Sequence, residues 1–277
     1  MTDRTIVVTG ASDGIGAAAA RAFADQGDRV VVIGRDPGKV EAVSSELGAD
    51  SHVADFAELD QVRALADALL ATCPRIDVLA NNAGGIFSSS RTTTVDGHET
   101  TFQVNYLAPF LLTALLTERL VEHRGIVVNT SSVGNRLFGK LDLDDLENAR
   151  GYKANKAYGD AKLAQILHAR ELQRRYGDRG LAAASFHPGN ISTNFAHGAG
   201  VPAMFRLAYC TPLRHVLRSP AHGADTLVWL ASSTPGVDWE PGEYYIDRKP
   251  GRANEQAHDP VLAAALWERS AAMVGVN

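Results

Sequence analysis

One short stretch of the chain contains two pairs of residues with the spacing of an acid–base couple. Tyr152 precedes Lys156 by four positions, and Tyr158 precedes Lys162 by four. Residues four apart lie on one face of a helix, so either pair would hold a phenol beside an ammonium group. Such a couple can donate and accept a proton near neutral pH, although a free Tyr titrates near ~10. The stretch therefore predicts proton-transfer chemistry at one of two tyrosines.

A glycine-rich turn after the first predicted strand indicates a phosphate-binding site. The residues of this turn that we expect to contact a nucleotide are Gly10, Ser12, Asp13, Gly14, Ile15 and Gly16. Glycine permits the tight turn and lets the backbone approach a pyrophosphate at a helix N-terminus. The spacing is G-x-x-x-G-x-G rather than the G-x-G-x-x-G of the general dinucleotide fingerprint. Taken alone, it is also compatible with a tight turn that binds nothing.

The end of the second predicted strand bears on the choice of nucleotide. Folds that bind NAD(H) usually carry an acidic residue here for the ribose 2′-hydroxyl, but this chain has Gly34 followed by Arg35. A guanidinium can pair bidentately with a 2′-phosphate. Against this, Asp13 and Asp36 could repel a phosphate, and Arg35 could simply be solvated. We therefore expect NADP(H), with NAD(H) as the alternative.

Other predicted strands also end in polar or small residues. These positions include Asp55, Phe56, Asn81, Asn82, Ala83, Gly84, Ser131, Ser132, Pro188, Gly189, Ile191 and Thr193. Asp55 could accept from an adenine amine, and Ala83 and Gly84 could admit a ring close to the backbone. Each residue alone is as compatible with an ordinary turn. Their common place at strand ends favours a site, because ligands of parallel sheets bind beyond the carboxyl ends of the strands.

The elements that must position these residues alternate between short apolar runs and helical periods. The expected strands are 5–9, 29–33, 51–54, 76–80, 125–130, 181–186 and 243–246, and the expected helices lie near 15–26, 37–47, 57–71, 96–121, 154–176, 220–232 and 260–274. This order predicts a doubly wound α/β fold, a seven-stranded parallel sheet with helices on both faces. No repeat or linker indicates a boundary, so a single domain is expected to span 1–277.

Composition argues against several classes of function. The 277 residues carry 27 Lys and Arg against 32 Asp and Glu, a net charge of -5, and no basic run, so nucleic acid is not an expected partner. Residues 1–5 lead directly into a strand and no apolar run reaches ~18 residues, so no leader or membrane anchor is expected. Cys73 and Cys210 lack the spacing of a disulfide framework or metal site. We expect a cytoplasmic protein without a metal.

Together these motifs resemble the short-chain dehydrogenase/reductase family, over nearly the whole chain and in the family's order. The residues that carry the resemblance are Thr9, Gly10, Gly14, Gly16, Asn81, Asn82, Ala83, Gly84, Asn105, Ser131, Ser132, Tyr158, Lys162, Pro188 and Gly189. Segments 157–172 and 242–246 resemble the retinol dehydrogenase and WW-domain oxidoreductase branch. The resemblance implies a Rossmann fold, a nicotinamide cofactor, and interconversion of a carbonyl and an alcohol. Because no N-terminal anchor is expected, it does not imply membrane-bound retinoid metabolism.

The resemblance also favours one of the two tyrosines. The family's helix continues amphipathically after its active pair, as this chain does after Lys162, and the residues around Tyr158 are small enough to admit a nicotinamide. Tyr152 is then expected in the entering loop or first turn, as a packing residue or pocket wall. Ser132 matches the family's catalytic serine, with Ser131 as the alternative.

Asn105 has two interpretations. It lies in a long apolar helical stretch, where Asn is locally unfavourable. It is either a buried amide with satisfied hydrogen bonds or, as the resemblance implies, the residue that holds a water relaying protons to Lys162.

The implied mechanism gives each side chain a role. Tyr158 protonates the carbonyl oxygen during hydride transfer, Ser132 hydrogen-bonds that oxygen, and Lys162 holds the nicotinamide ribose. Lowering a Tyr pKa from ~10 to ~7 requires about 4 kcal/mol. One Lys charge ~4 Å away at an effective dielectric of ~20 supplies about that amount. Lys162 is therefore sufficient in principle.

Two segments are implied to surround the substrate. Segment 134–151 makes the gap before Tyr158 longer than in compact members, so it reads as an inserted loop near the pocket. Such loops can block subunit association, so both a monomer and a homodimer are compatible with the sequence. Segment 190–219 is implied as a substrate lid, and 186–224 contains no Asp or Glu among many apolar residues. A small lipophilic carbonyl or alcohol is therefore expected, and arginines of this segment either meet an anionic end of it or are solvated.

Two other functions share some of these features. A non-catalytic NADP(H)-binding sensor would use the same glycine turn, but would not need Asn105, Ser132, Tyr158 and Lys162 together. A nucleotide-sugar epimerase or dehydratase would share Tyr-x-x-x-Lys. Those enzymes typically carry Thr-Gly-x-x-Gly-x-x-Gly and a longer C-terminal half, and this chain has neither.

Overall fold

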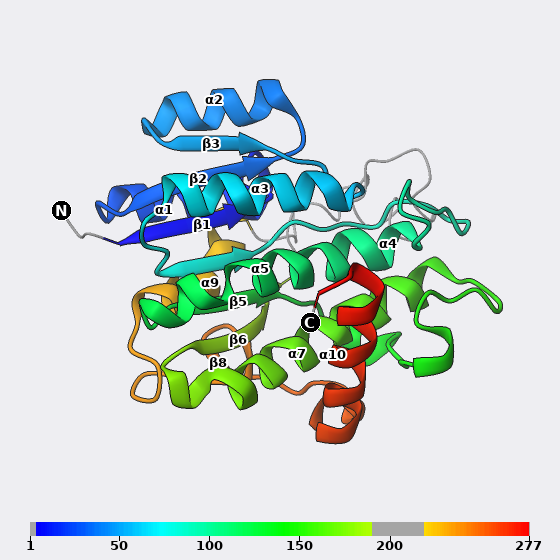
Figure 1. The fold of residues 1–277 in the computed structure, drawn as a ribbon. Coiled ribbons are helices and arrows are strands. Elements are labelled where there is room, and N and C mark those ends of the chain that lie inside the picture. The colour runs from blue at the N-terminus through cyan, green and yellow to red at the C-terminus, as the bar shows by residue number, and fades with distance from the viewer. Residues whose placement is uncertain (1–3, 190–218, 277) are drawn as a thin grey trace.

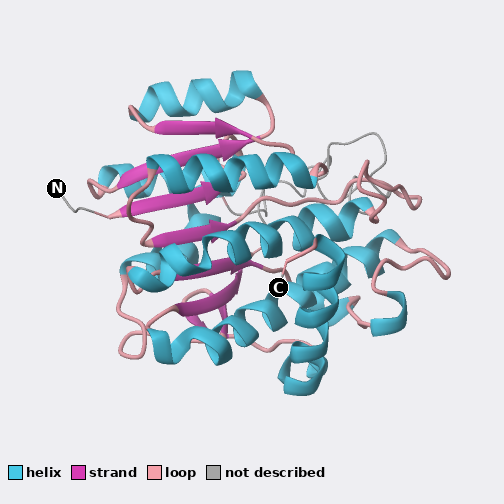
Figure 2. Cartoon of the chain, in the orientation of Figure 1, coloured by secondary structure: helices cyan, strands magenta, loops and turns pink. Residues whose placement is uncertain are grey.

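A single twisted sheet forms the centre of the molecule, with helices on both faces (Figures 1 and 2). The computed structural model describes residues 4–189 and 219–276. The strands in chain order are β1 (Thr5–Thr9), β2 (Arg29–Gly34), β3 (Asp50–Val53), β4 (Val78–Asn81), β5 (Ile126–Thr130), β6 (Ala182–His187), β7 (Tyr244–Ile246) and β8 (Lys249–Pro250). Their spatial order is β3-β2-β1-β4-β5-β6-β7-β8. The order reverses direction at β1, which is the signature of a doubly wound fold, so that prediction is confirmed.

The predicted number of strands was one too low. β1 to β7 pair in parallel, as expected, but β8 pairs with β7 antiparallel. The tight connection between them uses Asp247 and Arg248, both with positive φ. Hairpin turns of this kind are usually signalled by Gly or Asn, and neither occupies these two positions, so local pattern does not predict this short edge strand.

Helices cover the two faces of the sheet in two groups. They are α1 (Gly14–Asp25), α2 (Pro37–Leu47), α3 (Leu59–Thr72), α4 (Thr100–Phe102), α5 (Ala108–Glu122), α6 (Gly134–Leu137), α7 (Ala154–Tyr176), α9 (Pro220–Ser232) and α10 (Pro260–Val274). Alternate residues of β1 point to opposite faces. Ile6 and Val8 join a core with α1, α2 and α9, whereas Val7 joins a larger core with α3, α5, α7 and α10. Figure 1 shows α3, α5 and α7 crossing the same face.

Helix ends follow the capping signals of the sequence. Asp36 caps α2 by accepting from the backbone N–H of Lys39, and Gly48 ends that helix in the left-handed conformation. Ser219 caps α9 in the same way, immediately before Pro220. The expected ranges 37–47, 220–232 and 260–274, which begin after such caps, match the structure. The range 154–176 also matches, although Lys153 makes no side-chain cap there.

The helix expected near 96–121 starts later and is not uniform. Its first residue is Thr100, because the buried Glu99 carboxylate accepts from the N–H groups of Thr101 and Phe102 and so caps the helix there. A π-helical turn, Gln103–Leu107, then separates α4 from α5. The stretch Thr100–Glu122 is long and apolar enough to span a membrane, but 78% of its most apolar window is buried inside the protein. This stretch is therefore part of the protein core.

Candidate active site

A cavity of about 580 Å³ lies beyond the carboxyl ends of the parallel strands. It is lined by most of the residues that the sequence singled out, namely Gly10, Ser12, Asp13, Gly14, Ile15, Arg35, Asp55, Phe56, Asn82, Ala83, Gly84, Ser131, Ser132, Tyr158, Lys162, Pro188 and Gly189. Gly16 and Asn105 lie behind the cavity and do not line it. Ile191, Thr193 and the other residues of 190–218 lie outside the described residues, so of the expected lid only Ser219 is described.

The glycine turn brings backbone to the cavity wall. Gly10 has φ +64°, a conformation that favours glycine. A Cβ on Gly16 would collide with the carbonyl of Gly10, so this glycine lets α1 pack against the turn. Asp13 caps α1 by accepting from the N–H of Gly14 at 2.8 Å. The first two residues of α1, Gly14 and Ile15, line the cavity, which puts the N-terminus of this helix where an anion site is expected.

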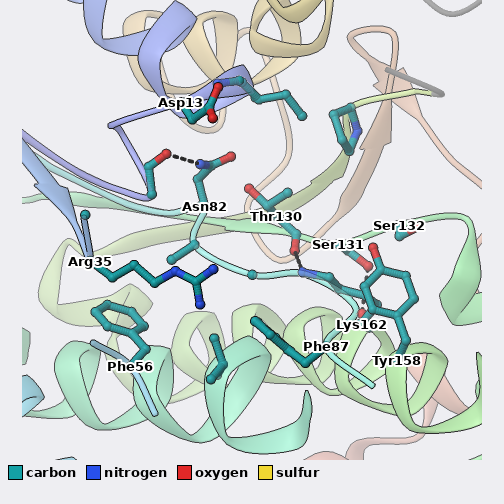
Figure 3. A pocket seen from close by; sticks show the side chains of 18 of the residues that line it. Asp13, Arg35, Phe56, Asn82, Phe87, Thr130, Ser131, Ser132, Tyr158 and Lys162 are labelled. Atoms are coloured by element: carbon teal, nitrogen blue, oxygen red, sulfur yellow. Dashed lines mark hydrogen bonds between the residues drawn. The ribbon is translucent and has the colours of Figure 1, made fainter. Parts of the chain in front are cut away.

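Two cations flank this turn. Arg35 follows β2, and Figure 3 shows its guanidinium pointing into the cavity on the same side as Phe56. Lys39, which the sequence reading missed, also lines the cavity and forms an exposed ion pair with Asp13 at 2.6 Å. The helix start at Asp36 places Lys39 in the first turn of α2, and this signal could have revealed it. The negative charge of Asp13 is thus offset by the charge of Lys39.

Thr9 and Asn82 clamp the ends of β1 and β4 together. The Thr9 hydroxyl accepts from the backbone N–H groups of Asn82 and Ala83, each at 3.0 Å, and the Asn82 amide donates to the Thr9 carbonyl at 3.0 Å. These bonds fix the chain that continues to Gly84. A Cβ on Gly84 would collide with the Asn105 side chain and lie 3.1 Å from the Lys162 ammonium. The glycine therefore leaves room around the lysine.

The Asn105 side chain is fully engaged with backbone. Its amide nitrogen donates to the carbonyls of Gly85 at 2.9 Å and Thr101 at 2.8 Å, and its oxygen accepts from the N–H of Gly85 at 3.0 Å. Its own main-chain carbonyl accepts from the Gln165 amide at 2.6 Å. The residue sits in the π-helical turn and is completely buried. This geometry fits the satisfied buried amide, and the water relay stays a prediction.

Lys162 is a buried ammonium that donates a hydrogen bond to a backbone carbonyl. The side chain donates to the carbonyl of Thr130 at 3.0 Å, and its nitrogen lies 5.6 Å from the centre of the Tyr158 ring. Burial lowers the pKa of Lys162 to about 7. The charge available near neutral pH is therefore smaller than a fully ionised lysine would supply. The Thr130 hydroxyl oxygen is also buried, with no hydrogen-bond partner among the described residues.

The two Tyr-x-x-x-Lys pairs have different surroundings. Tyr158 lines the cavity beside Lys162 (Figure 3), whereas Tyr152 donates to buried Glu99 at 3.4 Å. Burial, together with the Glu99 charge, raises the pKa of Tyr152 to about 12. Lys156 is paired with Asp160 at 2.5 Å. Tyr152 precedes α7 in the entering loop, as expected. It is absent from the cavity lining that the described residues form, so its contact with Glu99 fits the packing role of the two alternatives.

The two serines after β5 also differ. Ser131 is buried and donates its hydroxyl to the carbonyl of Lys162 at 2.7 Å. The Ser132 hydroxyl accepts from the N–H of Gly134 at 3.1 Å and is partly exposed at the cavity. Ser131 therefore uses its hydroxyl proton within the protein, whereas Ser132 can still donate its hydroxyl proton to a ligand.

An apolar wall completes the cavity on the side of Tyr158. Phe87 comes from the chain after β4, Val133 directly follows Ser132, and Leu137 and Phe138 come from segment 134–151. Leu137 is 58% exposed, although large apolar side chains are usually buried. The sequence reading placed this segment near the pocket but named none of these residues. Their orientation depends on how the segment docks, which local pattern does not specify.

A model of the short chain dehydrogenase family matches residues 4–200. The chain belongs to this family. It is therefore an oxidoreductase of the short-chain dehydrogenase type, which binds a nicotinamide cofactor and acts on alcohol or carbonyl groups. Among the described residues, no group of three or more His, Cys, Asp or Glu side chains is placed to hold a metal ion.

Similar proteins place the chain near ketoreductases and retinol dehydrogenases. A protein from Streptomyces sp. (strain C5) proposed to be the daunorubicin C-13 ketoreductase DnrU is 46% identical, covering 98% of this chain and 93% of that protein. Mouse retinol dehydrogenase 14 is 34% identical, covering 100% of this chain and 87% of the relative. The predicted likeness to the retinol dehydrogenase branch is thus confirmed.

Solved structures agree with this placement. An uncharacterised protein from Mycobacterium paratuberculosis superposes with a TM-score of 0.79 at 32% identity, covering 99% of this chain and 94% of that chain. A metagenomic short-chain oxidoreductase in complex with NADP superposes with a TM-score of 0.62 at 26% identity, covering 83% of this chain and 91% of that chain.

Proposed function

We propose that this short-chain dehydrogenase reduces the carbonyl group of a small lipophilic substrate with NADPH and can run the reverse oxidation. The observation that carries the proposal is the arrangement of one cavity. The acid–base pair Tyr158 and Lys162 lies with Ser132 at one end, and the glycine turn lies with Arg35 at the other (Figure 3). A dinucleotide spanning these ends would place its reactive ring beside the tyrosine.

The residues present fit such a cofactor. Gly10 and Gly84 are positions where a side chain would crowd the backbone cradle. Gly14 and Ile15 bring the α1 N-terminus to the cavity, where a pyrophosphate would be held. Lys162 retains donors beyond its bond to Thr130, which suit ribose hydroxyls. The nicotinamide, when bound, supplies or accepts the hydride.

The side chains of the cavity would supply proton and charge. Tyr158 donates its phenolic proton to the carbonyl oxygen, and Ser132 donates a hydrogen bond to the same oxygen as negative charge develops there. Lys162 stabilises the resulting phenolate. Because burial holds the pKa of Lys162 at about 7, its positive charge is strongest at slightly acid pH. Carbonyl reduction is accordingly favoured below neutral pH.

Preference for the phosphorylated cofactor rests on the cations after β2. Arg35 extends into the cavity, and Lys39 stands beside Asp13 within reach of the same region. Both are exposed, so neither pays a large desolvation cost in meeting a phosphate. The related structure solved with NADP supports this assignment.

The cavity wall and the relatives support the proposed substrate class. Phe87, Leu137 and Phe138 offer apolar surface beside Tyr158. A ketone such as that of daunorubicin and an alcohol such as retinol are the first compounds to test, because the relatives are named for them.

The decisive experiment measures oxidation of NADPH with a panel of lipophilic ketones and aldehydes, beside small polar ones. Turnover of the lipophilic carbonyls, abolished in Tyr158→Phe, is the expected result. Turnover of polar carbonyls alone would contradict the substrate class. NADPH binding without turnover of any carbonyl would contradict the enzymatic role and support a sensor instead.

A further inference from the structure

Asp160 is a buried acid inside the catalytic helix that the proposed chemistry does not use. It lies on α7 midway between Tyr158 and Lys162, and its side chain is completely buried. It does not line the cavity. Residues two apart on a helix point in nearly opposite directions, so Asp160 faces away from the side that bears the acid–base pair.

Three donors surround the Asp160 carboxylate. One oxygen accepts from the backbone N–H of Lys140 at 2.7 Å, and the other accepts from the Asn148 amide at 3.0 Å and from the Lys156 ammonium at 2.5 Å. Lys156 also donates to the Asn148 oxygen at 2.7 Å, which closes the network. Lys140 and Asn148 belong to segment 134–151, so the carboxylate connects that segment to α7 at two points.

The same segment touches α7 through backbone. A Cβ on Gly159 would lie 2.6 Å from the nitrogen of Gly139 and 2.8 Å from the carbonyl oxygen of Gly134. A Cβ on Gly134 would in turn lie 3.2 Å from the ring of Tyr158. The segment is therefore in direct contact with the turn of the helix that carries the acid–base tyrosine.

The far side of segment 134–151 is held by the C-terminal part of the chain. Asn254 donates its backbone N–H to the Asn135 side chain at 2.9 Å and its amide to the carbonyl of Gly139 at 2.8 Å. Gln256 exchanges two hydrogen bonds with the backbone of Leu141, each at 3.0 Å. Asp160 thus supplies the attachment on the helix side, opposite this second attachment.

Burying the Asp160 carboxylate carries a desolvation cost, so the network is not an efficient source of stability. Burial raises the pKa of Asp160 even though the ion pair with Lys156 and the hydrogen bonds favour its charged form. Buried ion pairs often contribute no more than an apolar replacement of the same volume, and their best-attested use is to specify one arrangement. A placement role accounts for this acid better than a gain in stability.

We propose that Asp160 is a positioning residue that fastens segment 134–151 to the catalytic helix and so fixes the substrate wall formed by Leu137 and Phe138. This inference rests on the proposed function, because it assigns that wall to the carbonyl substrate. Loosening the attachment would move the wall while the cofactor end of the cavity, built by β1, β2 and α1, stays in place.

The first test compares Asp160→Ala with Glu171→Ala. Glu171 is an equally buried acid of α7, but its partners Arg174 and Arg175 lie on its own helix, so its loss detaches no segment. Asp160→Ala is expected to raise the KM for a lipophilic carbonyl about tenfold, the equivalent of one lost hydrogen bond to a charged group, with the Kd for NADPH unchanged. Glu171→Ala is expected to leave both constants unchanged.

A second pair of variants tests placement rather than charge. Asp160→Asn turns an amide NH₂ towards the Asn148 amide and Lys156, so the substrate KM is expected to rise. In Asp160→Asn combined with Lys156→Met, the ammonium is gone and the Asn148 oxygen is free to accept from the new amide. The attachment then forms without charge, and the KM is expected to return towards the wild-type value.

Hydrogen exchange separates this inference from the proposed function. Without substrate or cofactor, backbone amides of 134–151 are expected to exchange faster in Asp160→Ala than in the wild type or Glu171→Ala. If no carbonyl is turned over but this exchange difference is seen, the proposed function fails and the attachment stands. A folded Asp160→Ala with wild-type exchange in 134–151, or with NADPH affinity falling as much as substrate affinity, would overturn the positioning role.

Discussion

The hydroxyl of Ser131 donates a hydrogen bond to the main-chain carbonyl of Lys162 at 2.7 Å. This bond joins the end of β5 to the catalytic helix and is completely buried. It uses the only proton that the Ser131 hydroxyl can donate. A substrate oxygen in the cavity therefore has Ser132 as its hydroxyl donor after this strand.

Exchange of the two serines for alanine should separate structure from catalysis. Ser132→Ala is expected to lower kcat/KM about 10²- to 10³-fold, as loss of one donor to a developing oxyanion does. Ser131→Ala is expected to keep most activity and to lose about 1 kcal/mol of stability, the net value of one hydrogen bond. Steady-state kinetics and thermal unfolding measure the two effects. The opposite distribution of effects would show that Ser131 contacts the substrate.

The tyrosines permit a similar comparison. Tyr158→Phe is expected to lower kcat about 10²- to 10⁴-fold, the usual contribution of a general acid, while NADPH still binds. Tyr152→Phe is expected to keep most of the activity, since among the described residues its hydroxyl bonds to Glu99 and Thr101, which lie outside the cavity. Cofactor fluorescence and turnover with the same carbonyl provide the measurements. Greater loss in Tyr152→Phe would assign catalysis to the other pair.

The sequence predicted the fold where local signals and chain order are sufficient. Asp36-Pro37 and Ser219-Pro220 mark helix starts through their own side chains, so those helices were placed correctly. The π-helical turn Gln103–Leu107 was not predicted, because its cause is tertiary. There Asn105 bonds to Gly85 and Gln165, which lie far away in the sequence.

The same distinction between local signals and tertiary contacts applies to the residues of the candidate site. Residues that directly follow strands, such as Arg35 and Asn82, reach the cavity because parallel strands end at one edge of the sheet. Chain order alone could not give the direction of a side chain. Both Ser131 and Ser132 follow β5, and only the contact of Ser131 with α7 distinguishes them. Leu137 depends on docking of a long segment, which no local pattern specifies.

Cofactor preference can be tested at Arg35, which follows β2, with Arg29 at the start of the same strand as the control. Arg35→Ala is expected to raise the KM for NADPH about 10- to 100-fold, as loss of a charge-assisted contact of ~1.5–3 kcal/mol implies, and to change the KM for NADH little. Arg29→Ala is the matched control, because Arg29 begins β2 at the opposite edge of the sheet and pairs with Asp50. Wild-type enzyme that binds NADH as tightly as NADPH would contradict the assignment.

The buried ammonium of Lys162 should make stability depend on pH in a defined direction. The folded-state pKa is about 7, below the value of about 10.5 for the unfolded chain, so between these values the unfolded state binds more protons. Stability of the wild type should therefore rise relative to Lys162→Met as pH increases from about 7 to about 10. Well below pH 7 the lysine is charged in both states, and there its burial costs most.

Lys162→Met should consequently be more stable than the wild type at neutral pH, by about 1 kcal/mol or more, or roughly 2–4 °C per kcal/mol for a domain of this size. This advantage should shrink towards pH 10. Thermal unfolding of both proteins without cofactor measures the difference, and because every other titrating group is shared, the difference isolates Lys162. If the stability difference between Lys162→Met and the wild type stays constant or grows with pH, Lys162 keeps its proton in the folded protein. The statement that its charge is reduced at neutral pH would then be wrong.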